Sequence, residues 1–413
     1  VQKKTINNLF VNSVFWLIIG ISIFLSSCLI LFSGWISIFY DLKILKIILP
    51  ITAVQFVFNS FIIVQKTLLT RELEFKVIRL IGLVSMIGSS LITIYLALNN
   101  YGIWSLVFGS IASSLITFVF YLKYSKWFPS FGFSWDALKS SVNFGLNITL
   151  LKTVNILKLT APELIVGKIL GTEALGLYTF AKAIMLKIVK QADAMIIEVL
   201  FPLFSRLQNK KTILVKGYLK VNHYTFLLTI PIFMGYIYIA EDFVGVIYGQ
   251  KWLAAVTISQ ILMIFTLINS VIGKGTSIIT AVGRPDISVK IELFMFIPLI
   301  TALLISVHFG IIHFVIVLVS FKSIEFIIQL MVLKNLVNLK FIKFLRCLKT
   351  PTIASIVMIT LLFILQSMLP QTIDPKASLI TIILSCGITY FLTIFYFDRQ
   401  ELIPTIRSLV KSK

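Results

Sequence analysis

Long runs of apolar residues, separated by short polar segments, repeat along the entire chain. Each run approaches or exceeds the roughly 20 residues with which an α-helix crosses a bilayer, and a backbone in hydrocarbon must satisfy its own hydrogen bonds within a helix. The pattern therefore predicts an all-α integral membrane protein. The 12 predicted transmembrane helices cover residues 14–39, 44–64, 77–98, 102–122, 142–165, 174–200, 218–240, 254–281, 291–309, 311–333, 352–369 and 378–397.

The composition excludes a soluble alternative. Of the 413 residues, 58% are hydrophobic and 13% are charged, and the mean hydropathy is +1.01. A soluble protein carries about 25% charged residues. So few charges cannot cover a surface that faces water, and lipid must therefore cover most of it.

Basic residues gather on one side of the predicted membrane. The chain has 37 Lys and Arg against 16 Asp and Glu, which gives a net charge of +21. We count the first three residues of each span with the segment before it. The N-terminus, every second loop after it and the C-terminal tail then hold 25 Lys and Arg, and the alternate loops hold five. This bias predicts that both termini are cytoplasmic, and it accounts for the charge without a nucleic-acid partner.

The two longest cytoplasmic connections are rich in aromatic and basic residues. Residues 334–351 alternate apolar and basic positions at helical spacing, and residues 123–141 carry five aromatic side chains among lysines: Trp127, Phe128, Phe131, Phe133 and Trp135. Both patterns are typical of amphipathic helices that lie in the membrane interface. We expect both segments to anchor the chain at the interface and to connect one group of spans to the next.

Seven lysines lie within the predicted spans, where each charge facing lipid would cost about 2.5–3.5 kcal/mol. Most of them must therefore face water or a polar partner. Lys152, Asn155 and Lys158 share one side of the fifth span. At 100° per residue the charges of the sixth span fall within an arc of about 160°, and these residues are Lys182, Lys187, Lys190, Asp193 and Glu198.

This clustering predicts a water-filled cavity with excess positive charge, which would suit an anionic substrate. The candidate substrate-binding residues are Lys152, Lys158, Lys182, Lys187, Lys190 and Lys274. The polar or coupling candidates are Asn155, Asp193, Glu198, Lys322 and Glu325. Alternative interpretations stay open, since Lys158 and Lys182 could extend to the interface, and Lys322 and Glu325 could neutralise each other.

Two further patterns predict interrupted helices. Lys274 lies between Gly273 and Gly275, which indicates a broken helix beside the cavity. Pro162 in the fifth span predicts that this helix breaks just before Glu163.

No catalytic or metal-binding motif accompanies these residues. The longest outer loop, residues 241–253, has 13 residues and leaves little room for a catalytic site. The sequence has no paired carboxylates in a loop, no His-Glu-x-x-His, no nucleophile elbow and no phosphate-binding Gly-x-x-x-x-Gly-Lys-[Ser/Thr]. It therefore predicts a transporter without catalytic residues, metal or cofactor.

Several segments resemble the motifs of one membrane protein family. Residues 71–76 (RELEFK) resemble its R-x-L-x-F-K loop, residues 99–107 contain its G-x-W-[SA]-L-V turn, and residues 167–181 resemble G-x-x-L-G-x-x-A-L-G-x-Y-x-x-A. Residues 200–208 (LFPLFSRLQ), 248–252 (YGQKW) and 283–286 (GRPD) follow in the same order. In this order the segments are similar to the polysaccharide-transport (Wzx-type) flippases of the multidrug/oligosaccharidyl-lipid/polysaccharide exporter superfamily.

The resemblance implies two pseudo-symmetric helical lobes around a central cationic cavity, followed by two C-terminal helices. Members typically have 14 spans, and this chain opens with what resembles the third, so we expect it to lack the first two. The implied parts are an N-lobe of four spans at 1–122, a connector at 123–141, a C-lobe of six spans at 142–333, a second connector at 334–351, and two spans with a basic tail at 352–413.

The resemblance also implies the cargo, a polyprenyl-diphosphate-linked oligosaccharide. It would be flipped from the cytoplasmic to the outer leaflet of the bacterial cytoplasmic (inner) membrane for the assembly of capsule, O-antigen of lipopolysaccharide, or exopolysaccharide. Membrane lipids are further implied partners, and a polysaccharide polymerase and glycosyltransferases are candidate ones.

Three alternatives differ in what they would require. A drug or cation antiporter of the same superfamily would favour carboxylates in the cavity, whereas the fifth and sixth spans carry five lysines against three acids. A membrane-embedded polysaccharide-assembly enzyme would need larger outer loops. The third alternative is a scaffold that does not transport. It would apply if the two family helices expected to be absent from this chain are essential for transport.

Overall fold

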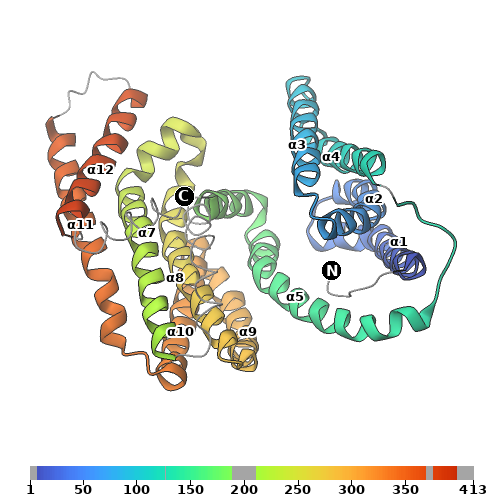
Figure 1. Ribbon diagram of the computed structural model, residues 1–413. Helices are drawn as coiled ribbons and strands as arrows, with labels where there is room; N and C mark the ends of the chain where they lie inside the picture. The colour runs from blue at the N-terminus through green and yellow to red at the C-terminus, as the bar shows by residue number, and fades with distance from the viewer. Residues whose placement is uncertain (1–6, 126, 188–210, 369–374, 398–413) are drawn as a thin grey trace. The chain divides into compact units, whose positions relative to one another are not determined.

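The computed structural model describes residues 7–125, 127–187, 211–368 and 375–397, which form helices and their connections without any strand. This confirms the predicted all-α class. The chain divides into two compact units, Val1–Ile156 and Leu157–Lys413 (Figure 1). The lobe and connector boundaries expected from the family resemblance stay predictions.

The first unit is built from pairs of antiparallel helices. Within it, α1 packs on α2, α3 packs on α4, and α2 also contacts α4. Hydroxyl groups join α3 to α4, where Thr117 donates a hydrogen bond of 2.7 Å to Ser85. The helices are α1 (Asn8–Phe39), α2 (Leu45–Arg71), α3 (Phe75–Leu98), α4 (Ile103–Tyr124) and the first part of α5 (Trp135–Ile169).

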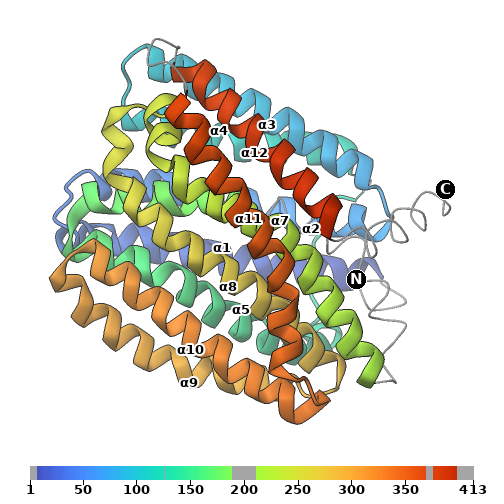
Figure 2. The ribbon, with the colours of Figure 1, turned by 90° about the vertical axis from the view of Figure 1, so that its left-hand side faces the viewer.

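The second unit contains the end of α5, a helical segment at residues 171–187 and the later helices of the described residues. Figures 1 and 2 show α9 beside α10, and α11 beside α12. These later elements are α7 (Lys211–Ile247), η1 (Gln250–Ala255), α8 (Val256–Ala281), α9 (Pro285–Ser306), η2 (Val307–Phe309), α10 (Ile311–Val337), α11 (Phe341–Met368) and α12 (Pro375–Phe397).

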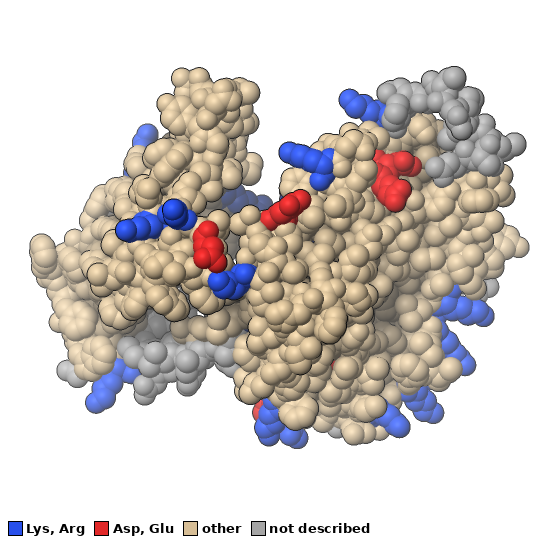
Figure 3. Space-filling model, turned by 180° about the vertical axis from the view of Figure 1, so that it is seen from behind, with Lys and Arg blue, Asp and Glu red and all other residues tan. Residues whose placement is uncertain are grey.

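Ten helices within the described residues are long and apolar enough to cross a membrane, and they coincide with ten of the 12 predicted spans. The predicted fifth span lies within α5, whose 35 residues include several charges. The predicted sixth extends beyond the described residues. Large apolar side chains such as Leu31 and Leu98 are 78% exposed, and Figure 3 shows wide surfaces without charge. Such surfaces suit contact with lipid.

Neither predicted helix break is present. The helix α5 continues through Pro162 to Ile169, and α8 is continuous from Val256 to Ala281 across Lys274 and its two neighbouring glycines. A proline removes one N–H group from the hydrogen-bond ladder, but neighbouring groups in a membrane helix compensate for this loss. Both expectations were therefore wrong.

The expected interfacial helices differ from the structure in different ways. The second one, residues 334–351, supplies the end of α10 and the first turns of α11, and Asn338 forms the left-handed cap between them. In the first, the described residues between α4 and α5 are not helical. Hydrogen bonds to α1 hold this segment, since Trp16 donates to the carbonyl of Ser130 at 3.1 Å and the Ser134 N–H donates to Ser13 at 2.9 Å.

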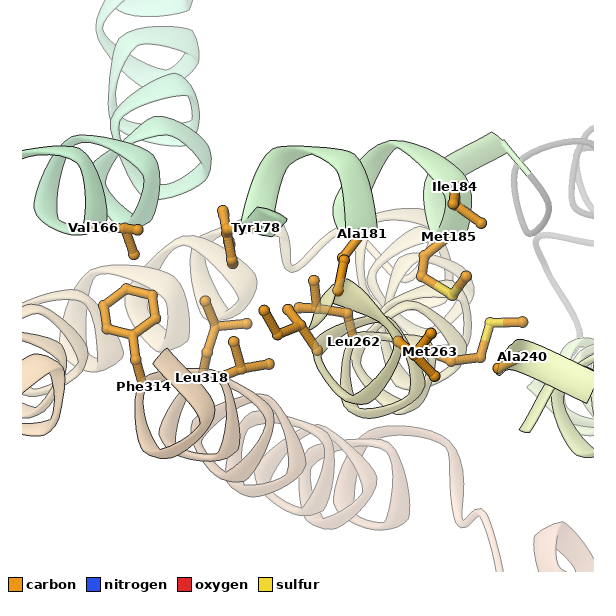
Figure 4. Packing of buried hydrophobic residues seen from close by; sticks show 14 of the residues in the cluster. Val166, Tyr178, Ala181, Ile184, Met185, Ala240, Leu262, Met263, Phe314 and Leu318 are labelled. Carbon is orange, nitrogen blue, oxygen red and sulfur yellow. The ribbon is translucent and has the colours of Figure 1, made fainter. Parts of the chain in front are cut away.

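The core of the second unit joins α5 and the 171–187 helix to α7, α8, α9 and α10. Val166 of α5 and Tyr178 and Ala181 of the 171–187 helix are fully or almost fully buried. Figure 4 shows them facing Phe314 of α10 and Met263 of α8. The rings of Tyr178 and Phe314 meet edge to face, with centroids 6.2 Å apart. This packing holds α5 and the 171–187 helix, which carry the predicted cationic residues, against the rest of the unit.

Five of the six segments that resemble family motifs lie at turns between helices, and the sixth, residues 200–208, lies outside the described residues. Five of them contain a residue with positive φ: Leu73 at 60°, Gly102 at 52°, Gly171 at 85°, Gly249 at 93° and Gly283 at 82°. Positive φ is costly for residues with a side chain and is tolerated by glycine. At Gly171 this geometry lets the chain reverse between α5 and the 171–187 helix. The motifs therefore mark the sites where the chain changes direction.

Candidate functional site

The candidate site is built on the hairpin formed by the end of α5 and the 171–187 helix. Lys182 Nζ lies 2.8 Å from Glu163 Oε1 and joins the two helices, and the two side chains are 22% and 31% exposed. The same amino group donates a hydrogen bond of 3.0 Å to the carbonyl of Leu159, near Pro162. Lys182 is thus neutralised and has a structural partner.

Two other lysines of this hairpin lack such a carboxylate partner among the described residues. Lys158 is partly buried and Lys187 is exposed, and within the described part of the chain neither forms an ion pair. A cation inside a membrane span is expensive unless it meets water or an anion. Lys158 and Lys187 are therefore the described residues of this hairpin best suited to attract a negatively charged group.

A second ionic group lies on α10. Lys322 Nζ is 3.0 Å from Glu325 Oε2, and the side chains are 15% and 9% exposed. Lys322 also lies 5.9 Å from the centroid of the Phe265 ring on α8. The geometry supports the alternative in which these two charges neutralise each other, because a buried pair of this kind satisfies both ions locally.

Lys274 on α8 is buried, with 8% of its surface exposed. Its amino group donates to the Ser270 hydroxyl at 2.7 Å and to the Ser270 carbonyl at 3.2 Å. Gln329 of α10 also reaches α8, where its amide donates to the Ile272 carbonyl and the Thr276 hydroxyl, each at 3.0 Å.

Ser270 and Gln329 make polar contacts in this region but are not among the residues predicted from the sequence. The signal that could have found them is spacing. Ser270 lies four residues before Lys274, and Gln329 lies four residues after Glu325, so each shares a helix face with a selected residue.

The remaining predicted residues are not placed by the structure. Lys190, Asp193 and Glu198 lie outside the described residues, and the side chains of Lys152 and Asn155 are likewise outside the description. Lys152 and Asn155 belong to the first unit, whereas the other candidates belong to the second. The role of the whole set in substrate binding stays a prediction. Among the described residues, no group of three His, Cys, Asp or Glu could hold a metal ion.

The ten apolar helices define a multi-pass helical membrane protein. The sequence profile of a family described as polysaccharide biosynthesis proteins matches residues 1–257, more than half of the chain. The chain belongs to this polysaccharide biosynthesis protein family. The resemblance drawn from the motifs is thereby confirmed at the level of the family.

Two relatives are named for the biosynthesis of teichuronic acid and of lipopolysaccharide. The teichuronic acid biosynthesis protein TuaB of Bacillus subtilis (strain 168) is 25% identical over 293 residues, which cover 70% of this chain and 60% of TuaB. The lipopolysaccharide biosynthesis protein WzxC of Escherichia coli (strain K12) is 25% identical over 309 residues, covering 73% of this chain and 62% of WzxC. The chain spans about three fifths of the length of these relatives.

A solved structure shares the fold. The lipid II flippase MurJ, in an inward closed conformation, matches with a TM-score of 0.76 and 17% sequence identity, over 95% of this chain and 84% of MurJ. At this identity the likeness establishes the fold alone.

Proposed function

We propose that the protein is a flippase that moves a lipid-diphosphate-linked oligosaccharide from the cytoplasmic to the outer leaflet of a bacterial cytoplasmic membrane. The product would serve the assembly of a surface polysaccharide such as capsule, O-antigen or exopolysaccharide. The observation that carries the proposal is the presence of cations within membrane-spanning helices of a chain that belongs to a polysaccharide biosynthesis family. A diphosphate is the part of such a cargo that these cations would attract.

The ion pairs separate two of the predicted cationic residues from the others. Lys182 and Lys322 are held by Glu163 and Glu325, so we assign them to helix packing. Lys158 and Lys187 would attract the diphosphate. Lys152 and Lys190, whose side chains the structure does not describe, would contribute to the same attraction. The prenyl chain of the cargo could stay in lipid while the headgroup crosses through a polar path.

The membrane potential supplies a driving force for this direction of transport. Moving two negative charges out of a negative interior gains about 4–5 kcal/mol per 100 mV. The emptied, positively charged site would then be drawn back toward the interior by the same potential. Alternating access of this kind requires neither a nucleotide nor a catalytic group, and for this reason we propose a transporter rather than an enzyme.

The first experiment is complementation. A set of bacterial strains, each lacking its own flippase, receives the chain and is scored for surface polysaccharide. We expect rescue in at least one strain. The proposal is wrong if no strain is rescued although each strain's own flippase rescues it and the chain is found in the membrane.

The second experiment tests the lysines in a rescued strain and in vesicles loaded with that strain's lipid-linked oligosaccharide. The double variant Lys158→Gln/Lys187→Gln is expected to slow flipping at least about tenfold, equivalent to about 1.4 kcal/mol, and to weaken its dependence on an imposed potential. The matched control is Lys123→Gln/Lys290→Gln, which removes the same charge from exposed positions at helix ends. Equal flipping rates in the two double variants would remove the assigned role of Lys158 and Lys187.

A further inference from the structure

The first unit contains a cavity whose lining includes none of the predicted substrate-binding lysines. It has a volume of about 670 Å³ and lies where the start of α1, the end of α2 and the connection between α4 and α5 meet. This volume is within the range of about 300–1,000 Å³ that is typical of small-molecule sites. The charge bias of the loops places this end of the helices on the predicted cytoplasmic side.

The cavity wall is held in place before any ligand arrives. Asn12 of α1 is buried, donates to the Ser130 hydroxyl and accepts from the Ser130 N–H at 3.3 Å. The Trp127 ring packs edge to face on Phe15, with centroids 5.6 Å apart. These contacts fix a segment without helical structure against α1. Pre-organisation of this kind lowers the entropy cost of binding.

The lining combines flat aromatic surfaces with neutral hydrogen-bonding groups. Trp127 and Phe128 provide the aromatic surface, and Asn8 adds an amide that can both donate and accept. Arg71 and Glu72, adjacent at the end of α2, carry opposite charges. The charges of the lining therefore nearly cancel, which favours a neutral polyhydroxylated ligand over a phosphate.

We propose that this cavity binds sugar residues of an oligosaccharide on the cytoplasmic side of the membrane. The aromatic rings would contact the apolar C–H faces of the sugar, and the amide and charged groups would bond to its hydroxyls. The use of the cavity for taking up cargo rests on the proposed flippase function. Binding of a free oligosaccharide does not require transport.

The experiment measures binding of the purified full chain, in lipid nanodiscs, to an array of lipid-free bacterial oligosaccharides. Phe128→Ala is the test variant, because Phe128 lines the cavity and is 62% exposed. Phe131→Ala is the matched control, since Phe131 is 97% exposed on the same segment and lies outside the lining. Asn8→Ala, at an exposed position, is the second test variant, and unchanged thermal unfolding of all variants confirms folding.

We expect the natural chain to bind at least one oligosaccharide, with the signal reduced at least about fivefold by Phe128→Ala and by Asn8→Ala and retained in Phe131→Ala. The proposal is overturned if no oligosaccharide binds above empty nanodiscs, or if the test and control variants behave alike. It is also overturned if inorganic pyrophosphate displaces the bound sugar, because the cavity would then be a phosphate site. A chain that binds sugars but rescues no strain would contradict the flippase function alone.

Discussion

Gly275 lies where α8 meets Gln329 of α10, so it offers a direct test of this helix contact. A Cβ added at Gly275 would lie 2.6 Å from Gln329 Cδ and 3.1 Å from its Nε2, too close for either atom to remain in place. The Gln329 amide is held by its bonds to Ile272 and Thr276 and cannot withdraw without losing them. At Gly273, two residues earlier on the same helix, an added Cβ would have no neighbouring atom within 4 Å.

The expected effects of the two substitutions have opposite signs. Alanine in place of glycine favours a helix by about 0.5–1 kcal/mol, so Gly273→Ala should stabilise the protein by up to that amount. Gly275→Ala gains the same helix propensity. It also loses two hydrogen bonds, each worth about 0.5–1.5 kcal/mol, and leaves buried polar groups without partners. We expect a net destabilisation of about 1–3 kcal/mol for Gly275→Ala.

The assay is reversible unfolding of the purified protein in mixed micelles with increasing denaturing detergent. Each glycine variant is measured in the natural chain and in a Gln329→Ala background. Without the Gln329 side chain the penalty of Gly275→Ala should disappear, because nothing then opposes the added methyl group. If Gly275→Ala stabilises the natural chain as much as Gly273→Ala does, the described contact between α8 and Gln329 is refuted.

Three further outcomes can be measured by the same unfolding titration. Glu163→Gln should destabilise the protein by about 1–3 kcal/mol, between the values of exposed and buried ion pairs, and adding Lys182→Met should recover most of that loss. Glu325→Gln should cost more than Glu163→Gln, because the Lys322–Glu325 pair is less exposed; equal losses would argue against burial as the cause. Gly249→Ala should cost about 1–2 kcal/mol, because φ at this position is 93°, and a stabilising effect would contradict the positive φ.

The spans could be predicted because they depend on local composition. The helix α3, Phe75–Leu98, begins within two residues of its predicted start and ends at its predicted end. The helix α9 begins at Pro285, six residues before its predicted start. Pro285 at the first helical position and Asp286 in the first turn are both typical of a helix start. The predicted boundary differs because it follows the apolar residues alone.

Features that depend on distant parts of the chain could not be predicted. The segment between α4 and α5 has the aromatic and basic composition of an interfacial helix, yet its conformation depends on hydrogen bonds to α1, more than 100 residues away. The two ion pairs show the same contrast. Lys322 and Glu325 are three residues apart, so their pairing could be foreseen, whereas Lys182 and Glu163 meet only because the chain reverses at Gly171.

The positive-φ turns within the motif segments have a practical consequence for engineering. These residues ensure that the chain changes direction between helices, and they lie at or beyond the ends of the helices that carry the intramembrane lysines. Sequence motifs of this kind identify a fold but do not indicate which substrate the protein binds. The turns are accordingly suitable junctions for chimeras, in which helices from two relatives are exchanged between shared turns so that the architecture is kept while the helices that carry the intramembrane lysines are replaced.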